Sequence, residues 1–192
     1  CAPAAWLLAL CVLLLLVGST QASPAGVMVT DDAGRRVTLE QPARRIVSLA
    51  PFITELLFAA GAGAAVVGVS EFSDYPEAAR DIRQIGGGGG LDLEAIVALR
   101  PDLVIAWKSG NPTGQVERLQ ALGLSVYLSE PRQLGDVSQT LRRFGVLAGT
   151  GGVAEAGADA FEQQHKQLQL KYAGQQPVSV FYQIWARPLM TL

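Results

Sequence analysis

Cysteine and histidine are almost missing from this chain of 192 residues. The two cysteines, Cys1 and Cys11, both lie in an apolar N-terminal segment, and the single histidine is His165. Beyond residue 11 the chain can therefore form neither a disulfide nor a thiolate site. One histidine without cysteine cannot make a typical zinc site, and a Ser-His-Asp triad is hard to build around a histidine in a polar helical segment.

An excess of charge of either sign is also missing. The formal net charge is −2, which gives no reason to expect nucleic acid or an anionic membrane as a partner. Carboxylates are scattered along the chain, and no pair has the spacing that acid–base catalysis would need. Without such a catalytic arrangement we do not expect an enzyme. Because 49% of the residues are hydrophobic, the chain is globular rather than disordered.

The first 30 residues contain no charged side chain. The run Ala4–Gly18 is almost wholly apolar, too short to span a bilayer comfortably but typical of a signal h-region, and Thr20–Ala22 supplies small residues for cleavage. We expect residues 1–22 to be an N-terminally incomplete signal peptide directing the protein to the periplasm, with a short membrane anchor as the alternative. Cys11 follows Leu10, which argues against lipid attachment.

Short apolar runs alternate with amphipathic segments between residues 44 and 150. The predicted strands are Arg45–Leu49, Ala65–Val69, Asp102–Ala106 and Leu124–Leu128. The predicted helices are Thr54–Ala60, Asp92–Leu99, Gly114–Leu122 and Leu134–Leu147. This alternation predicts an α/β fold, with a Rossmann-like lobe whose parallel sheet is covered on both faces.

The segments on either side of this lobe follow other patterns. Val27–Glu40 alternates around a glycine turn, which predicts a β-hairpin within a lead-in of residues 23–43. Residues 151–175 are predicted to be a connecting helix, whose pattern Val153–Tyr172 would reach roughly 30 Å at 1.5 Å per residue. Val178–Trp185 predicts a new strand, so we expect residues 176–192 to begin a second, truncated α/β lobe.

Five consecutive glycines precede the helix in QIGGGGGLDLEAIVALRPDLVIAW. A dinucleotide fingerprint needs glycines at positions one, three and six, and no start within the run supplies all three. A Walker loop needs a Gly-Lys-Ser/Thr ending, and no lysine follows. The run is therefore predicted to be a flexible loop that binds no phosphate, with Asp92 capping the next helix and Glu94 near its positive end.

Aromatic and neutral polar residues gather just after the predicted strands. In open α/β sheets, ligands bind beyond the carboxyl ends of the strands. The predicted ligand-binding residues are Phe52, Phe72, Ser73, Asp74, Tyr75 and Trp107. Core packing is the better interpretation of each aromatic residue alone, but together they favour a pocket for a bulky, flat, mostly apolar ligand.

Three stretches, RIVSLAPFITELLFAAGAGAAVVGVSEFSDYPEAA, LDLEAIVALRPDLVIAWKSGN and VFYQIWARPLMTL, resemble periplasmic substrate-binding proteins of ABC importers. The resemblance is strongest to the cobalamin-binding members of a group that also carries haem and iron–siderophore complexes. It implies two α/β lobes joined by a long helix, with the ligand held between them. It further implies that the protein, a monomer with no cofactor or metal of its own, captures cobalamin or a related corrinoid for an importer permease.

The resemblance also assigns individual roles. The loop around Phe72 would face the corrin, with Phe where cobalamin binders commonly have Tyr, and Gly88 stands where a relative carries Trp. Glu94 resembles the acidic residue that docks this lobe onto permease arginines. The alternatives are a haem or siderophore binder of the same fold and, more distantly, a Rossmann-like nucleotide-dependent enzyme. A haem binder usually needs an axial His or Tyr, for which Tyr75 is the nearby candidate.

Overall fold

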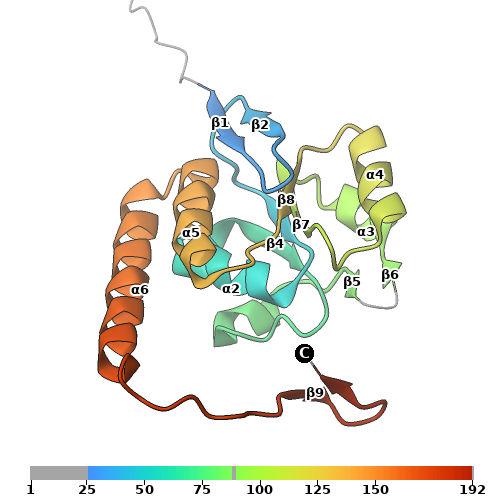
Figure 1. The fold of residues 1–192 in the computed structure, drawn as a ribbon. Coiled ribbons are helices and arrows are strands. Elements are labelled where there is room, and N and C mark those ends of the chain that lie inside the picture. The colour runs from blue at the N-terminus through green and yellow to red at the C-terminus, as the bar shows by residue number, and fades with distance from the viewer. Residues whose placement is uncertain (1–25, 88–89, 192) are drawn as a thin grey trace, which may run out of the picture.

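A four-stranded parallel sheet forms the centre of the protein (Figure 1). The computed structural model describes residues 26–87 and 90–191, so the predicted signal segment and Gly88 lie outside the described residues. The strands are β3 (Ile46–Ser48), β4 (Val66–Val69), β7 (Leu103–Trp107) and β8 (Val126–Ser129), arranged in the order β4-β3-β7-β8. The predicted α/β class and parallel pairing are thus confirmed.

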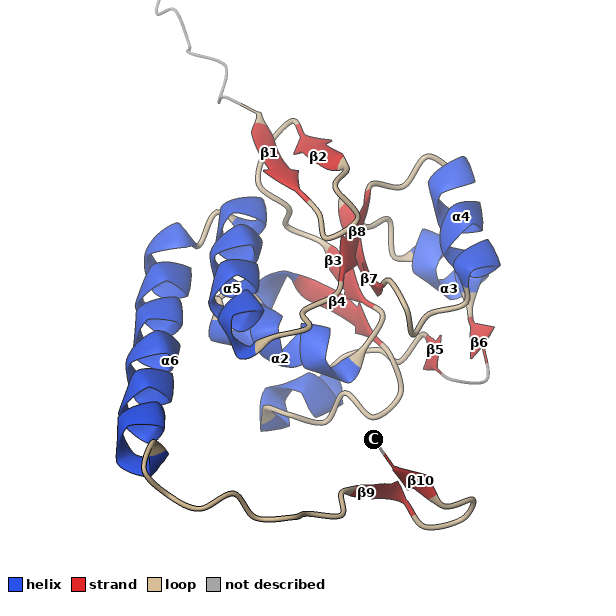
Figure 2. Ribbon diagram, in the orientation of Figure 1, coloured by secondary structure: helices blue, strands red, loops and turns tan. Residues whose placement is uncertain are grey.

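Helices cover both faces of this sheet (Figure 2). One face carries α2 (Pro51–Ala59), α5 (Leu134–Ala148) and α6 (Gly151–Tyr172), and the other carries α3 (Leu93–Ala98) and α4 (Thr113–Ala121). Successive strand residues alternate between the two hydrophobic cores: in β7, Leu103 and Ile105 face the first, and Val104 and Ala106 the second. Burial on both faces explains why these strands are continuous apolar runs.

The direction in which the chain crosses the sheet reverses between β3 and β7. From β3 the chain returns through α2 to β4 on one side, whereas from β7 it returns through α4 to β8 on the other side. The connections after β3 and β7 therefore leave the sheet toward opposite faces. A crevice opens between two such connections at the carboxyl edge, and ligands of open α/β sheets bind there.

Helix ends follow local sequence signals with small shifts from the predicted boundaries. The helix α2 begins at Pro51, three residues before the predicted start, since proline suits the first helical position. Asp92 caps α3 as predicted, and its side chain accepts a hydrogen bond of 2.9 Å from the Ala95 N–H. The helix α5 ends at Gly149, whose φ of 72° is left-handed.

The lead-in hairpin consists of β1 (Val27–Thr30) and β2 (Arg36–Leu39), as the alternation predicted. It is fastened to the carboxyl end of β8 by two aspartates. Asp31 is buried and accepts from the Leu128 N–H at 3.3 Å, while Asp32 accepts from the Glu130 N–H at 2.7 Å and pairs with Arg143. The hairpin is thus an integral part of the lobe.

The described residues at the two ends of the glycine run form regular structure, so the prediction of a flexible loop is wrong for them. Strand β5 (Gly86–Gly87) pairs with β6 (Gly90–Leu91), and the Glu71 N–H donates to the Gly86 carbonyl at 2.9 Å. A Cβ on Gly86 would lie 2.3 Å from the Gly90 carbonyl oxygen, and its φ of 95° is left-handed. Glycine is therefore required by close backbone approach.

The helix α6 packs along α5 through Ala154 and Ala158, its two buried residues, and is otherwise largely exposed. Arg142 on α5 bonds to three carboxylates of α6, Glu155 at 2.9 Å, Asp159 at 2.7 Å and Glu162 at 2.6 Å. Among the described residues, no helix has the length and apolar character needed to cross a membrane.

The strand predicted over Val178–Trp185 is only partly correct. Residues 176–182 have no regular structure, and the strand β9 (Gln183–Trp185) pairs with β10 (Met190–Thr191) in a small separate hairpin. Val178, Val180 and Phe181 are all exposed, because no neighbouring strand in the described part of the chain supplies hydrogen bonds to this stretch. Two short 3₁₀ segments, η1 (Gly63–Ala65) and η2 (Glu77–Asp81), flank β4.

Candidate ligand-binding site

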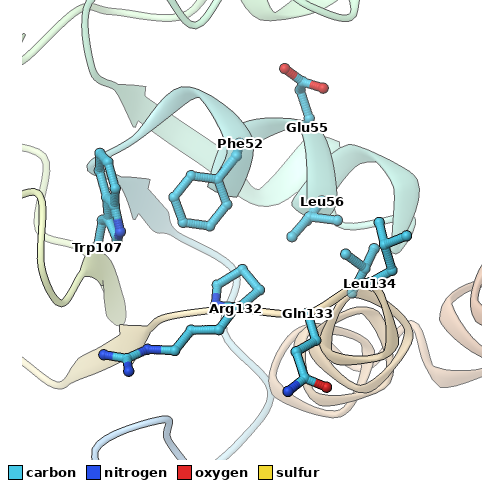
Figure 3. Close-up of a pocket in the computed structure, with 9 residues that line it drawn as sticks. Phe52, Glu55, Leu56, Trp107, Arg132, Gln133 and Leu134 are labelled. Carbon is cyan, nitrogen blue, oxygen red and sulfur yellow. The ribbon is translucent and has the colours of Figure 1, made fainter. Parts of the chain in front are cut away.

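An apolar cavity of about 460 Å³ opens at the carboxyl edge of the sheet, in the crevice where the chain direction reverses (Figure 3). Its walls come from the start of α2, the end of β7 and the connection from β8 into α5. The lining residues are Phe52, Glu55, Leu56, Trp107, Pro131, Arg132, Gln133, Leu134 and Val137. Apolar walls with a few polar groups at the rim are typical of small-molecule sites.

Phe52 and Trp107 form the aromatic part of this wall. Their ring centroids are 5.8 Å apart and their planes meet at 87°, an edge-to-face contact. Asn111 fixes the turn after β7, since its side chain accepts from the Trp107 N–H at 2.7 Å and donates to the Leu49 carbonyl at 2.9 Å. The connections after β3 and β7 are thereby tied together at the crevice.

Carboxylates hold the remaining wall in place. Glu130, at the end of β8, accepts from both the N–H and the hydroxyl of Ser109, at 3.0 and 2.9 Å. Asp136 accepts from the backbone N–H groups of Arg132 and Gln133, at 2.8 and 2.9 Å, and these bonds lower the pKa of its carboxyl. The connection from β8 into α5 is therefore held by charged hydrogen bonds before any ligand arrives.

The loop after β4 carries the other predicted aromatic residues, but none of them lines this cavity. Phe72 and Tyr75 are exposed, with 72% and 68% of their surface accessible, and Asp74 is exposed beside them. Because β4 is the edge strand of the sheet, its loop lies at one end of the row of connections, whereas the cavity is lined by residues at the ends of β3, β7 and β8. The structure thus brings Phe52 and Trp107 together and leaves Phe72 and Tyr75 as a separate exposed pair.

Ser73 differs from its predicted place at the ligand surface. It is only 5% exposed, and its hydroxyl lies 3.1 Å from the Thr54 hydroxyl and 3.2 Å from the Ser70 hydroxyl. A side chain whose polar group is already bonded in the interior presents nothing to a ligand at the surface. The turn reverses the chain at this residue, and sequence position alone does not reveal which neighbours point inward.

Residues 131–137 form half of the cavity and were not predicted as site residues. A signal for them was present in the sequence, because the stretch SEPRQL directly follows the predicted strand Leu124–Leu128. Ligands bind beyond the carboxyl ends of the strands, so the connection after this fourth strand lies at the same sheet edge as Phe52, Phe72 and Trp107. This connection was not predicted as part of the site because it contains no aromatic residue.

Arg132 also lines a second cavity, of about 390 Å³ and strongly polar. The lining residues are Asp32, Lys108, Glu130, Arg132, Asp136, Gln139 and Arg143. Positive and negative side chains are balanced there, and Arg143 already pairs with Asp32. Separately, Glu94, the predicted docking residue, is exposed in the first turn of α3.

A parallel sheet with an apolar crevice at its reversal point defines an α/β ligand-binding lobe. Consistent with this, residues 46–186 match the family model described as periplasmic binding protein. Because the match covers most of the chain, the protein belongs to the periplasmic binding protein family. The resemblance inferred from the sequence motifs is confirmed.

Individual relatives are also similar to this chain. The vitamin B12-binding protein of Vibrio campbellii is 39% identical over 151 residues, which is 79% of this chain and 55% of the relative. The crystal structure of the periplasmic vitamin B12 binding protein of Vibrio cholerae has a TM-score of 0.75 at 37% identity, covering 79% of this chain and 59% of that one. A periplasmic haem-binding protein from Pseudomonas aeruginosa has a TM-score of 0.64 at 25% identity, covering 73% and 52%. The chain thus spans little more than half the length of these relatives.

Proposed function

We propose that this protein captures cobalamin or a related corrinoid outside the cytoplasm and delivers it to an ABC importer. No bond is made or broken in this function, and cobalamin is the cargo rather than a cofactor. The flat apolar area of the ligand would be removed from water against the carboxyl edge of the lobe, which supplies the main driving force.

The observation that carries this proposal is the row of aromatic rings along one edge of the sheet. Phe52 and Trp107 pack edge to face over the apolar cavity, and Phe72 and Tyr75 project from the loop after the edge strand. Rings presented by separate connections suit a ligand much wider than one cavity. The cavity of about 460 Å³ would receive one part of such a ligand, while Phe72 contacts another.

The polar rim supports recognition of a ligand bearing amide side chains. Arg132 and Gln133 stand at the cavity mouth, where their side chains are exposed and able to donate hydrogen bonds. Glu55 lies on the opposite side of the cavity and can only accept. Donors and acceptors placed around an apolar floor would fix the orientation of the ligand without contributing most of the affinity.

Export and delivery complete the proposed role. Residues 1–22 would direct the protein to the periplasm, where it would act as a monomer. Glu94 would then contact the membrane permease, since its carboxylate is exposed in the first turn of α3. A rim charge of this kind governs encounter rate and salt dependence more than final affinity.

Haem is the second candidate ligand, and one specific observation favours it. Tyr75, a residue type that serves as an axial haem ligand, lies in the loop after β4 with 68% of its surface exposed. His165 does not fit this role, because it lies on α6 beside Phe161, away from the sheet edge.

Parallel calorimetric titrations of the full-length protein with cobalamin, cobinamide and hemin test the proposal. We expect tight binding of both corrinoids and weak or no binding of hemin. Binding of hemin with no response to either corrinoid would overturn the ligand assignment while leaving the fold untouched. In that case Tyr75→Phe should abolish the iron–phenolate absorbance, which identifies the axial residue directly.

A further inference from the structure

A cluster of four buried hydroxyls lies where the ends of β3 and β4 meet the first turns of α2. Ser48, Thr54, Ser70 and Ser73 are each at most 5% exposed. Thr54 Oγ1 lies 2.8 Å from Ser48 Oγ and 3.1 Å from Ser73 Oγ, and Ser73 Oγ lies 3.2 Å from Ser70 Oγ. Ser48 in turn donates to the Ala50 carbonyl at 3.1 Å. The four hydroxyls therefore form one continuous chain of hydrogen bonds.

This chain joins segments that are distant in sequence. Ser48 is the last residue of β3, Thr54 belongs to the first turns of α2, and Ser70 and Ser73 bracket the turn after β4. The Ser73 N–H donates to the Ser70 carbonyl at 3.3 Å, which closes the turn, and the Ser70 N–H donates to the Ser48 carbonyl at 3.0 Å. Hydrogen bonds from side chains and from the backbone thus hold the same four-residue turn, Ser70–Ser73, in place.

Phe72 occupies the position of this turn that normally requires glycine. Its φ is 64°, in the left-handed region, at the third residue of a turn closed between Ser70 and Ser73. An L-residue with a bulky side chain is strained in this conformation, because its Cβ approaches the following carbonyl oxygen. Such a conformation persists only where the surroundings over-determine it, and residues of this kind cluster at ligand clamps and active sites.

We propose that the Ser48–Thr54–Ser73–Ser70 hydroxyl cluster is a positioning device that holds Phe72 left-handed, so that its ring projects from the sheet edge toward the ligand. The ring is 72% exposed although the turn itself is anchored by buried groups. Thr54 lies two residues after Phe52 on the same helix, so the cluster also sets the spacing between the Phe52 and Phe72 rings. The inference rests on the proposed function only where it assigns Phe72 to the ligand.

The key variant is Thr54→Val, which keeps the shape of the side chain and removes its hydroxyl. Thr54→Ser, which keeps the hydroxyl, should behave like the original protein. Thr140→Val is the matched control, since Thr140 is equally buried and donates within α5 to the Asp136 carbonyl at 2.8 Å. It removes a comparable hydrogen bond from the lobe without touching the turn.

Limited digestion with chymotrypsin gives a readout that needs no ligand. We expect Thr54→Val to accelerate cleavage after Phe72 about fivefold or more in native buffer, because the turn is no longer held. Cleavage after Tyr127 and Phe144, which are fully buried, reports global unfolding and should change equally in Thr54→Val and Thr140→Val. Unchanged cleavage after Phe72 in Thr54→Val would overturn the proposal.

Corrinoid titration of the same variants gives the second readout. Thr54→Val should weaken binding about fivefold to tenfold, the scale of one lost buried hydrogen bond, but should have no effect in a Phe72→Ala background. An equal loss in both backgrounds would mean that the cluster acts on the fold and not on Phe72. If the unaltered protein binds no corrinoid while cleavage after Phe72 still responds, the positioning role stands and the proposed function fails.

Discussion

Phe52 and Trp107 meet edge to face, with 5.8 Å between ring centroids, although 55 positions separate them in the chain. Phe52 follows β3 and Trp107 ends β7, and these two strands are neighbours at the point where the sheet reverses direction. Asn111 ties the two connections to each other from below. The aromatic wall of the cavity is therefore set by backbone geometry before any ligand binds.

Replacement of Trp107 tests this wall directly. Trp107→Ala should weaken corrinoid binding by about 1–3 kcal/mol, because an aromatic face is lost from the contact and Phe52 loses its partner. Titration calorimetry measures the change. Leu122→Ala is a suitable control, since Leu122 is a comparably exposed apolar residue at the end of α4, away from the cavity. Equal affinities for Trp107→Ala and the original protein would remove Trp107 from the site.

Charge reversal at Glu94 separates ligand capture from delivery. Glu94→Arg should leave corrinoid affinity unchanged and slow permease-dependent uptake severalfold, because an attractive rim charge becomes repulsive. Uptake of labelled corrinoid by cells or proteoliposomes is the measurement. Glu40→Arg makes the same change of charge at an exposed residue just after β2 and should transport normally. Normal uptake with Glu94→Arg would mean that Glu94 does not dock onto the permease and interacts only with the N-terminus of α3.

The contact of Arg142 with α6 predicts a salt-dependent attachment of the long helix. Arg142 bonds to Glu155, Asp159 and Glu162, and removing it would leave three carboxylates in one row without their shared cation. Arg142→Met should lower the thermal unfolding midpoint by a few degrees at low ionic strength. The difference should shrink as salt is added, because the three carboxylates are exposed and their charges are screened. A difference that is constant from low to high salt would point to lost packing instead.

The carboxyl of Asp136 predicts how stability depends on pH at the cavity rim. Backbone N–H groups of Arg132 and Gln133 lower its pKa below the ordinary 3.8. Since the pKa is lower in the folded state, this contribution to stability is fully present above pH 3.8 and is lost as pH falls through the lowered value. Asp136→Asn should therefore flatten the decline of unfolding free energy with acid, measured by denaturant titration. An identical acid profile in both proteins would exclude Asp136 as a contributor.

Local sequence signals were sufficient for most of the regular structure. Runs such as Asp102–Ala106 are apolar on both faces, which only a covered parallel strand requires, and the helices end at glycine or before proline. Signals of this kind depend only on residues that are close together in the chain, so they can be recognised without knowledge of the fold. Val178–Val180 shows the limit, because a strand also needs a neighbour to supply hydrogen bonds.

By itself, the sequence determined that Phe52, Phe72 and Trp107 follow strands and so lie at one edge of a sheet. Only the tertiary structure decided that strands β4, β3, β7 and β8 lie in this order and that Phe52 packs against Trp107, since β3 has β4 on one side and β7 on the other. It also decided that Ser73 turns inward and that residues 131–137 complete the cavity. Strand order is set by hydrogen bonds between segments far apart in the chain, and no local pattern of side chains encodes them.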